Sequence, residues 1–150
     1  MIVQDYRGRN MEYDLGRFKT AQDNDFETAM NEIAAGKKRS HWIWYIFPQL
    51  KSLGYSEFAV FYGIQDSAEA KAYIDDKMLG GNLIRITETL LQHKGKNIVR
   101  IFGRTDAMKV RSCMTLFEHV SDNKVFAEVL DAFYDGERDE RTLELLENEK

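Results

Sequence analysis

The stretch that decides the fold is Ser40-His41-Trp42-Ile43-Trp44-Tyr45-Ile46-Phe47-Pro48-Gln49. Its six central residues are all large and apolar or aromatic, and it holds both tryptophans and the single proline of the chain. A segment that is apolar on every side must be enclosed by protein. We therefore expect this stretch to form the centre of the core, with the titratable His41 buried inside it.

Six apolar residues in a row fit a buried strand or a buried helix, and periodicity does not separate the two. A helix is favoured, because no neighbouring segment offers a partner strand with clear alternation. Pro48 ends it, because the residue before a proline is displaced from the helical region.

Most other segments have the apolar spacing and the polar caps of amphipathic helices. Ser56, Ser67 and Asp139 are predicted caps, and Asp23-Asn24-Asp25 is predicted to separate two helices. Gly80-Gly81 is predicted to be a junction. Residues 97–102 give the best strand candidate, but one lone strand has nothing to pair with. The sequence thus predicts an all-α, compact single-domain bundle of about seven or eight short helices around a buried aromatic helix.

Composition sets the broad class of the protein. With 150 residues, 43% of them hydrophobic, we expect one globular domain over residues 14–150, preceded by a tail over residues 1–13. A net charge of −4 argues against nucleic-acid binding. The single cysteine, Cys113, permits no internal disulfide, and no apolar run is long enough for a membrane span. We expect a cytoplasmic monomer that holds no metal and no cofactor.

A helix predicted from Asp106 to His119 divides its faces unusually. At about 100° per residue, an apolar arc faces a second arc in which hydroxyls replace the Lys and Glu of an ordinary solvent face. Ser112 and Thr115 would hydrogen-bond a polar ligand, and Arg111 would hold a carboxylate or phosphate. A desolvated Lys109, beside the apolar arc, would act as a base or an electrostatic catalyst. The structural alternative is that Lys109 extends past the core edge, the hydroxyls face a neighbouring helix and Arg111 pairs with Glu118 or another acid.

Three residues of the aromatic stretch carry the same two interpretations. His41 is a general acid or base, or a core histidine whose ring is satisfied by a carbonyl or carboxylate. Trp44 is a core residue, one face of which is also able to stack on a ligand. Gln49 lines a cleft at the end of the stretch or caps a loop.

Three separated stretches together resemble a known family. They are Leu15-Gly16-Arg17-Phe18 with Ala21-Gln22, residues 36–50 with Leu53-Gly54 and Ser56, and Ile101-Phe102-Gly103 through Asp106, Lys109, Arg111-Ser112 and Met114-Thr115-Leu116-Phe117. The chain resembles the bacterial family known as domain of unknown function 1810, some members of which carry a misleading calpastatin label. The resemblance implies a compact all-helical fold and no established activity. Its signature includes His41, Gln49, Lys109, Arg111, Ser112 and Thr115, which favours a shared pocket.

Two functions compete at this point. The first is a binder or hydrolase of a small phosphorylated or ribosylated metabolite. A looser, fold-level similarity to helical N-glycosidases that act on ADP-ribose and riboflavin-pathway intermediates favours it. His41 or Glu88 would then activate water. The second is a non-enzymatic interaction module that uses the acidic C-terminal helix or the turn at residues 37–39. The absence of a sheltered polar pocket between the aromatic stretch and residues 109–115 would favour the module.

Overall fold

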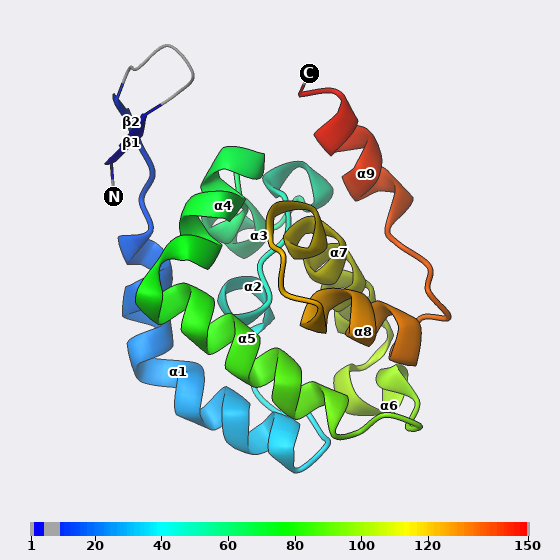
Figure 1. Ribbon diagram of the computed structural model, residues 1–150. Coiled ribbons are helices and arrows are strands. Elements are labelled where there is room, and N and C mark those ends of the chain that lie inside the picture. Colours follow the sequence, from blue (N-terminus) through cyan, green and yellow to red (C-terminus); the bar gives the residue numbers. More distant parts are fainter. Residues whose placement is uncertain (1, 5–9, 150) are drawn as a thin grey trace.

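The computed structural model describes residues 2–4 and 10–149, and over these residues the chain is all-α, as predicted (Figure 1). This part of the chain forms nine α-helices, one 3-10 helix and two short strands. The helices are α1 (Gly16–Ala34), α2 (Ile43–Ile46), η1 (Lys51–Leu53, 3-10), α3 (Glu57–Tyr62), α4 (Ser67–Asp75), α5 (Lys77–Leu91), α6 (Ile98–Phe102), α7 (Arg104–Val120), α8 (Val125–Phe133) and α9 (Glu140–Glu147).

The aromatic stretch lies in the middle of the bundle, as the sequence predicts. Only one turn of it, α2, is helical, and Figure 1 shows this turn surrounded by the longer helices. The side chains of Trp42, Ile43, Ile46 and Phe47 are each 1% exposed. The rings of Trp42 and Phe47 meet the ring of Phe102 edge-on, with centroids 6.4 and 5.6 Å apart.

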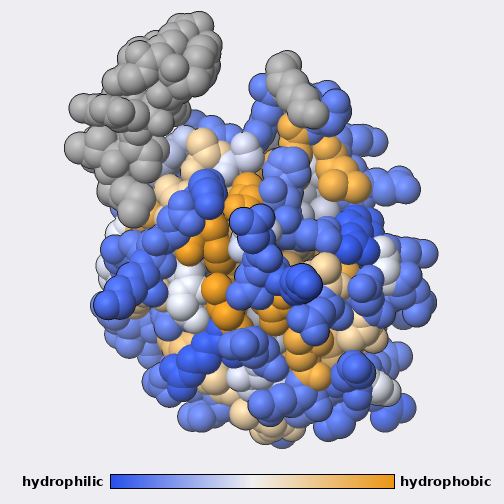
Figure 2. Space-filling model, in the orientation of Figure 1, coloured by the Kyte–Doolittle hydropathy of each residue, from blue (hydrophilic) through white to orange (hydrophobic). Residues whose placement is uncertain are grey.

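The longer helices pack around this centre. Helix α5 contacts α1, α4 and α8, while α7 contacts α4, α6, α8 and α9. On the face drawn in Figure 2, hydrophilic side chains cover most of the surface and hydrophobic ones show mainly near its centre. No helix in the described part of the chain combines the length and the apolar character needed to cross a membrane.

The predicted break at Asp23-Asn24-Asp25 is wrong, because α1 runs through it without interruption. Gln22 and Phe26, four residues apart, are both buried against the core. Asp23 and Asn24 lie on the opposite, exposed face of the same helix. Polar residues there mark the solvent side of one long helix and not the end of a short one.

The predicted junction at Gly80-Gly81 is also wrong, because both residues lie inside α5. A Cβ atom on Gly80 would lie 2.0 Å from the carbonyl oxygen of Ile74, so this glycine permits α5 to approach the end of α4 closely. A Cβ atom on Gly81 would meet nothing within 4 Å. Gly80 is thus explained by packing between helices.

The strand predicted at residues 97–102 and the predicted helix caps are settled by burial and by hydrogen bonds. Residues 98–102 form helix α6, not a strand, and the buried Ile98, Ile101 and Phe102 have helical spacing. Ser56 and Asp139 cap α3 and α9 as predicted, since their side chains accept hydrogen bonds from backbone N–H groups of the first turn. Asp66, not Ser67, caps α4.

The N-terminal segment contains an antiparallel ladder that the sequence did not indicate. Strand β1 (Ile2–Gln4) pairs with β2 (Asn10–Glu12), with Ile2 opposite Glu12. Figure 1 shows the ladder projecting from the α1 side of the helical body. Tyr13 follows it and is buried, and its hydroxyl donates to Asp66 at 3.3 Å.

Candidate functional site

Trp44 separates two clefts on the surface of the bundle. Within the single turn of α2, Ile43 and Ile46 point into the core, and Trp44 is left half-buried between them on the outer side. Its ring lies 5.0 Å from that of Phe58 on α3. Trp44 lines a cleft toward α7 and another toward α1, so the tryptophan belongs to both.

The first cleft, which we call the Lys109 cleft, has a volume of about 450 Å³ and brings together four of the predicted site residues. These are Trp44, Gln49, Lys109 and Ser112. The full lining is Trp44, Gln49, Leu53, Gly54, Tyr55, Ser56, Ala59, Thr105, Met108, Lys109, Ser112, Asp139 and Arg141.

Gln49 is positioned by a short backbone pairing across the cleft wall. The N–H of Ile64 donates to the carbonyl of Gln49 at 2.9 Å, and the N–H of Lys51 donates to the carbonyl of Ile64 at 2.8 Å. Leu50 and Ile64 thereby form an isolated parallel bridge. This pairing fixes the backbone directly after Pro48, and with it the residue that carries the side-chain amide of Gln49.

Lys109 belongs to a small group of charges with Asp106 and Lys38, of which Lys109 alone lines the cleft. Its Nζ is 3.3 Å from Oδ1 of Asp106 and 5.2 Å from the ring centroid of Trp44. Lys38 approaches the other oxygen of the same carboxylate, at 3.0 Å. The Lys38 side chain is only 8% exposed, so it is not a free surface charge. Sequence reasoning missed the roles of Lys38 and Asp106 behind Lys109, although an aspartate three residues before Lys109 on a helix was a usable signal.

Arg111 and Thr115 lie beside the cleft and not in its wall. Two guanidinium nitrogens of Arg111 are 3.9 Å from Glu137 and 3.8 Å from Asp139, and its Nε is buried with no hydrogen-bond partner among the described residues. Thr115 donates to the carbonyl of Arg111 at 2.8 Å and accepts from the N–H of Asp139 at 2.9 Å. Both residues therefore support Asp139, which does line the cleft. Arg111 pairs with these acids and not with Glu118, which binds Arg138.

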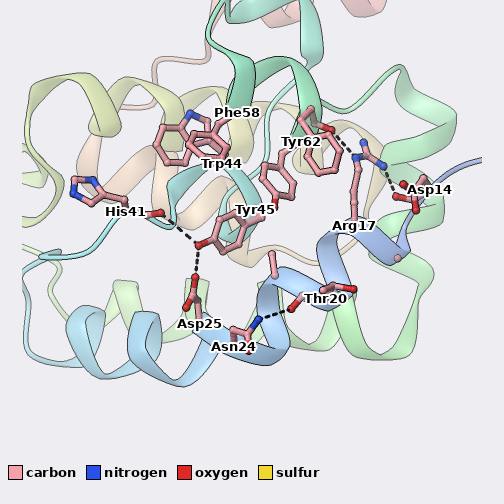
Figure 3. A pocket seen from close by; sticks show the side chains of 13 residues that line it. Asp14, Arg17, Thr20, Asn24, Asp25, His41, Trp44, Tyr45, Phe58 and Tyr62 are labelled. Carbon is pink, nitrogen blue, oxygen red and sulfur yellow. Dashed lines mark hydrogen bonds between the residues drawn. The ribbon is translucent and has the colours of Figure 1, made fainter.

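The expected burial of His41 is wrong. Its side chain is exposed, because the core begins one residue later, at Trp42. Figure 3 shows its imidazole ring turned away from Tyr45 and Asp25, and only its carbonyl oxygen accepts a hydrogen bond from the Tyr45 hydroxyl, at 3.4 Å. His41 is also absent from the Lys109 cleft, so the two residues predicted to act in catalysis, His41 and Lys109, line different hollows.

The second cleft, which we call the Asp25 cleft, lies between α1 and the pair α2 and α3 and has a volume of about 730 Å³ (Figure 3). Its lining residues are Asp14, Gly16, Arg17, Thr20, Ala21, Asn24, Asp25, His41, Trp44, Tyr45, Phe58, Phe61 and Tyr62. Aromatic rings form one wall and polar groups of α1 form the other. The hydroxyl of Tyr45 donates to Asp25 across the cleft. The pKa of the Tyr45 phenol is raised, mainly by burial and further by the contact with Asp25.

The chain segment before α2 is held by one carboxylate. Glu32 on α1 accepts hydrogen bonds from the N–H groups of Arg39 and Ser40, from the Ser40 hydroxyl and from the Trp42 indole, at 2.6–2.9 Å. Burial by itself raises the pKa of the Glu32 carboxyl, but these hydrogen bonds outweigh it and lower the pKa to about 2.

Within residues 2–4 and 10–149, no three acidic, histidine or cysteine side chains are grouped to hold a metal ion.

The chain is similar to one solved structure over nearly its whole length. The crystal structure of the conserved hypothetical protein Rv1873 from Mycobacterium tuberculosis superimposes with a TM-score of 0.88 at 43% sequence identity, covering 90% of this chain and 97% of that one. No protein with a curated description matches. The family model for proteins of unknown function termed DUF1810 matches residues 12–146. The chain therefore belongs to the DUF1810 family, as its aromatic stretch and its Lys109 segment predicted.

Proposed function

We propose that the Lys109 cleft binds a small anionic metabolite that carries a planar ring, such as a phosphorylated or ribosylated compound. The observation that carries this proposal is the position of Lys109, whose ammonium lies over the ring of Trp44 at the wall of a cleft of ligand size. Ligand pockets typically combine an apolar or aromatic lining with a few placed polar groups.

The charges around Lys109 leave an excess of positive charge. Two ammonium groups, those of Lys38 and Lys109, share the one carboxylate of Asp106. The group of three residues therefore carries a net charge of +1. An anion that enters the cleft would complete its neutralisation, at a place where partial burial weakens solvent screening.

The other lining groups suit the remainder of such a ligand. Tyr55 offers a ring face and is 95% exposed, so it is free to reorient over a bound molecule. Trp44 offers the part of its ring that Lys109 and Phe58 leave uncovered. Gln49 and Ser112 offer an amide and a hydroxyl. These four side chains match a planar ring joined to a hydroxyl-bearing group, with the anionic end at Lys109.

Binding has stronger support than hydrolysis. The carboxylate in the cleft wall, Asp139, accepts from the N–H and hydroxyl of Thr142 and faces Arg111, so its oxygens are already engaged. His41 lines the other cleft. Glu88 is exposed on α5, outside the lining of the Lys109 cleft, and so has no part in it. The group that would activate water is thus not supplied by the candidates that the sequence suggested.

The interaction-module alternative has less support. An open cleft whose polar lining includes Gln49, Lys109 and Ser112 lies between the aromatic stretch and α7, which supports ligand binding over the module. In the turn at residues 37–39, Lys38 is ion-paired and its side chain is 8% exposed, so only Lys37 and Arg39 of this turn are left as exposed charges for a partner.

A thermal-shift titration with inorganic pyrophosphate, AMP and ADP-ribose tests the proposal. A ligand at about 100 times its dissociation constant stabilises by about 2.7 kcal/mol, which is roughly 5–10 °C for a domain of this size. We expect the compounds that join a ring to a phosphate to give the largest shift. Lys109→Met, which keeps the packing of the stem on Trp44 and removes the charge, should abolish it.

The matched control is Lys71→Met, which removes an exposed lysine on α4 and should leave every shift unchanged. Circular dichroism confirms that each variant is folded. Equal shifts for Lys109→Met and the wild-type protein, or no shift with any of the three compounds, would contradict the proposal.

A further inference from the structure

We propose that the Asp25 cleft is a second binding site, specific for a small organic cation of the alkylammonium class. This inference is independent of the anion site, because it rests on the opposite side of Trp44 and on different charged residues. Figure 3 shows the arrangement that carries it, with aromatic rings from α2 and α3 on one side and Asp25 of α1 on the other, where the Tyr45 hydroxyl reaches its carboxylate.

The aromatic wall is a continuous row of rings. Phe58 lies 5.0 Å from Trp44 and 6.5 Å from Tyr62 by ring centroids, and Phe61 lies 4.8 Å from Tyr62. Phe58 and Phe61 both belong to the short helix α3, and they are 57% and 56% exposed, so a ligand in the cleft is able to reach both rings. The faces of aromatic rings carry negative partial charge and attract cations, most strongly where water is displaced.

The polar wall adds negative charge of its own. Asp14 and Asp25 both line the cleft. Asp25 accepts one hydrogen bond among the described residues, from the phenol of Tyr45, which is a neutral donor and leaves the charge of the carboxylate in place. An alkylammonium ion between the two walls would meet ring faces on one side and a carboxylate on the other.

The positive residue in the cleft does not cancel this charge, because Arg17 is already neutralised. Its guanidinium pairs with Glu69, at 3.0 Å, and donates to the carbonyls of Asp14, Phe61 and Gly63. The Glu69 side chain is only 3% exposed. Arg17 therefore acts as a brace that ties α3 to α1 and sets the width of the cleft, and the net charge of the lining stays negative.

Binding of choline and of tetramethylammonium, measured by isothermal titration calorimetry, tests the site. The control ligand is 3,3-dimethylbutan-1-ol, a neutral molecule with the shape of choline. We expect both cations to bind with dissociation constants below about 10 mM, and the neutral alcohol to bind at least about tenfold more weakly, since only the cations gain from the rings and the carboxylate. Equal binding of choline and the alcohol, or no saturable binding of either cation, would overturn the proposal.

Variants locate the binding in this cleft. Phe58→Leu keeps an apolar side chain and removes the ring, and Asp25→Asn removes the charge and keeps an acceptor for Tyr45; each should weaken choline binding about three- to tenfold. Tyr55→Leu removes an exposed ring outside this cleft, and Lys71→Met removes an exposed lysine on α4 that lines neither cleft, so neither should change it. Loss of choline binding in Tyr55→Leu but not in Phe58→Leu would refute the site.

A final comparison distinguishes two sources of the cation. A trimethyl-lysine peptide that binds more tightly than choline would identify a methylated protein segment as the ligand, whereas choline binding tighter than the peptide would identify a free amine.

Discussion

The two clefts share Trp44 but differ in how their charges are compensated. Behind the wall of the Lys109 cleft, the ammonium groups of Lys109 and Lys38 share the one carboxylate of Asp106, so a positive charge remains. In the Asp25 cleft the guanidinium of Arg17 is bound by the buried Glu69 and by three carbonyls. The charge of Asp14 and Asp25 therefore makes this cleft negative. The comparison teaches that the partners behind the lining residues decide how much of the charge of a cleft is left uncompensated.

The strongest way to break this contrast is Glu69→Ala, which leaves Arg17 without its carboxylate. Removing one partner of a buried ion pair typically costs about 3–5 kcal/mol, because the other charge stays buried and uncompensated. We expect a loss near the lower end of that range in urea-induced unfolding, since the Arg17 side chain keeps its carbonyl acceptors and is 10% exposed. The same variant should weaken choline binding, because the lining of the Asp25 cleft gains a positive charge.

The matched control for this variant is Glu144→Ala. Glu144 also pairs with an arginine, Arg141, at 3.2 Å, but both side chains are more than half exposed. Exposed pairs contribute at most about 1 kcal/mol, so this variant should be close to neutral. Similar losses of unfolding free energy for the two variants would show that the Arg17–Glu69 pair contributes no more to stability than an exposed ion pair does.

A smaller effect is expected from Glu32→Gln, which loosens the support of the Lys109 cleft. Glu32 holds the segment that carries Lys38 and leads into α2 through four hydrogen bonds. The substituted amide would retain one acceptor oxygen and lose the charge that strengthens these bonds. We expect the free energy of unfolding at pH 7 to fall by about 2 kcal/mol, measured by chemical denaturation.

The same carboxylate predicts a pH dependence with a definite sign. The pKa of Glu32 is about 2 in the folded chain and 4.5 at its ordinary value, so the folded state binds the proton less readily. Its contribution is therefore fully present above about pH 4.5 and is lost as the pH falls toward 2. The difference in stability between wild type and Glu32→Gln should shrink over that window. A difference that stays constant from about pH 7 to about pH 3 would contradict the assignment.

The sequence was sufficient to predict the class of fold, and four of the residues that it singles out line the Lys109 cleft. Trp44 and Gln49 belong to one unusual stretch, and Lys109 and Ser112 stand out on one helix, so local patterns identified all four. The position of His41 was not predictable in this way. Trp42 points into the core and His41 does not, and a one-residue difference at the start of a single helical turn leaves no periodic signal.

Apart from His41 and Trp44, the residues of the Asp25 cleft escaped sequence reasoning for a different reason. Phe58 and Phe61 have the residue type of core positions, and nothing local indicates that the short helix α3 leaves them exposed. The sequence predicts a helix break at Asp25, whereas α1 continues and presents this residue to rings that come from distant parts of the chain. Sites built by the packing of distant segments depend on tertiary structure, which a single sequence does not reveal.

The smallest expected effect comes from Asp106→Asn, which sharpens the contrast instead of breaking it. Without this carboxylate, Lys38 and Lys109 stand near each other with no anion between them, so the charge of the Lys109 cleft rises. The unfolding free energy should fall by about 1 kcal/mol, less than for Glu32→Gln, because Lys109 is partly solvated and salt screens the repulsion.

In the same Asp106→Asn variant, pyrophosphate should bind about threefold more tightly, since the anion now replaces a missing partner. Choline binding in the Asp25 cleft should not change, because its charges are set by Asp14, Asp25 and the neutralised Arg17. Titration of both ligands into this one variant distinguishes the two clefts directly: weaker pyrophosphate binding would mean that Asp106 orients Lys109 for the ligand, and a change in choline binding would mean that the clefts are coupled through Trp44.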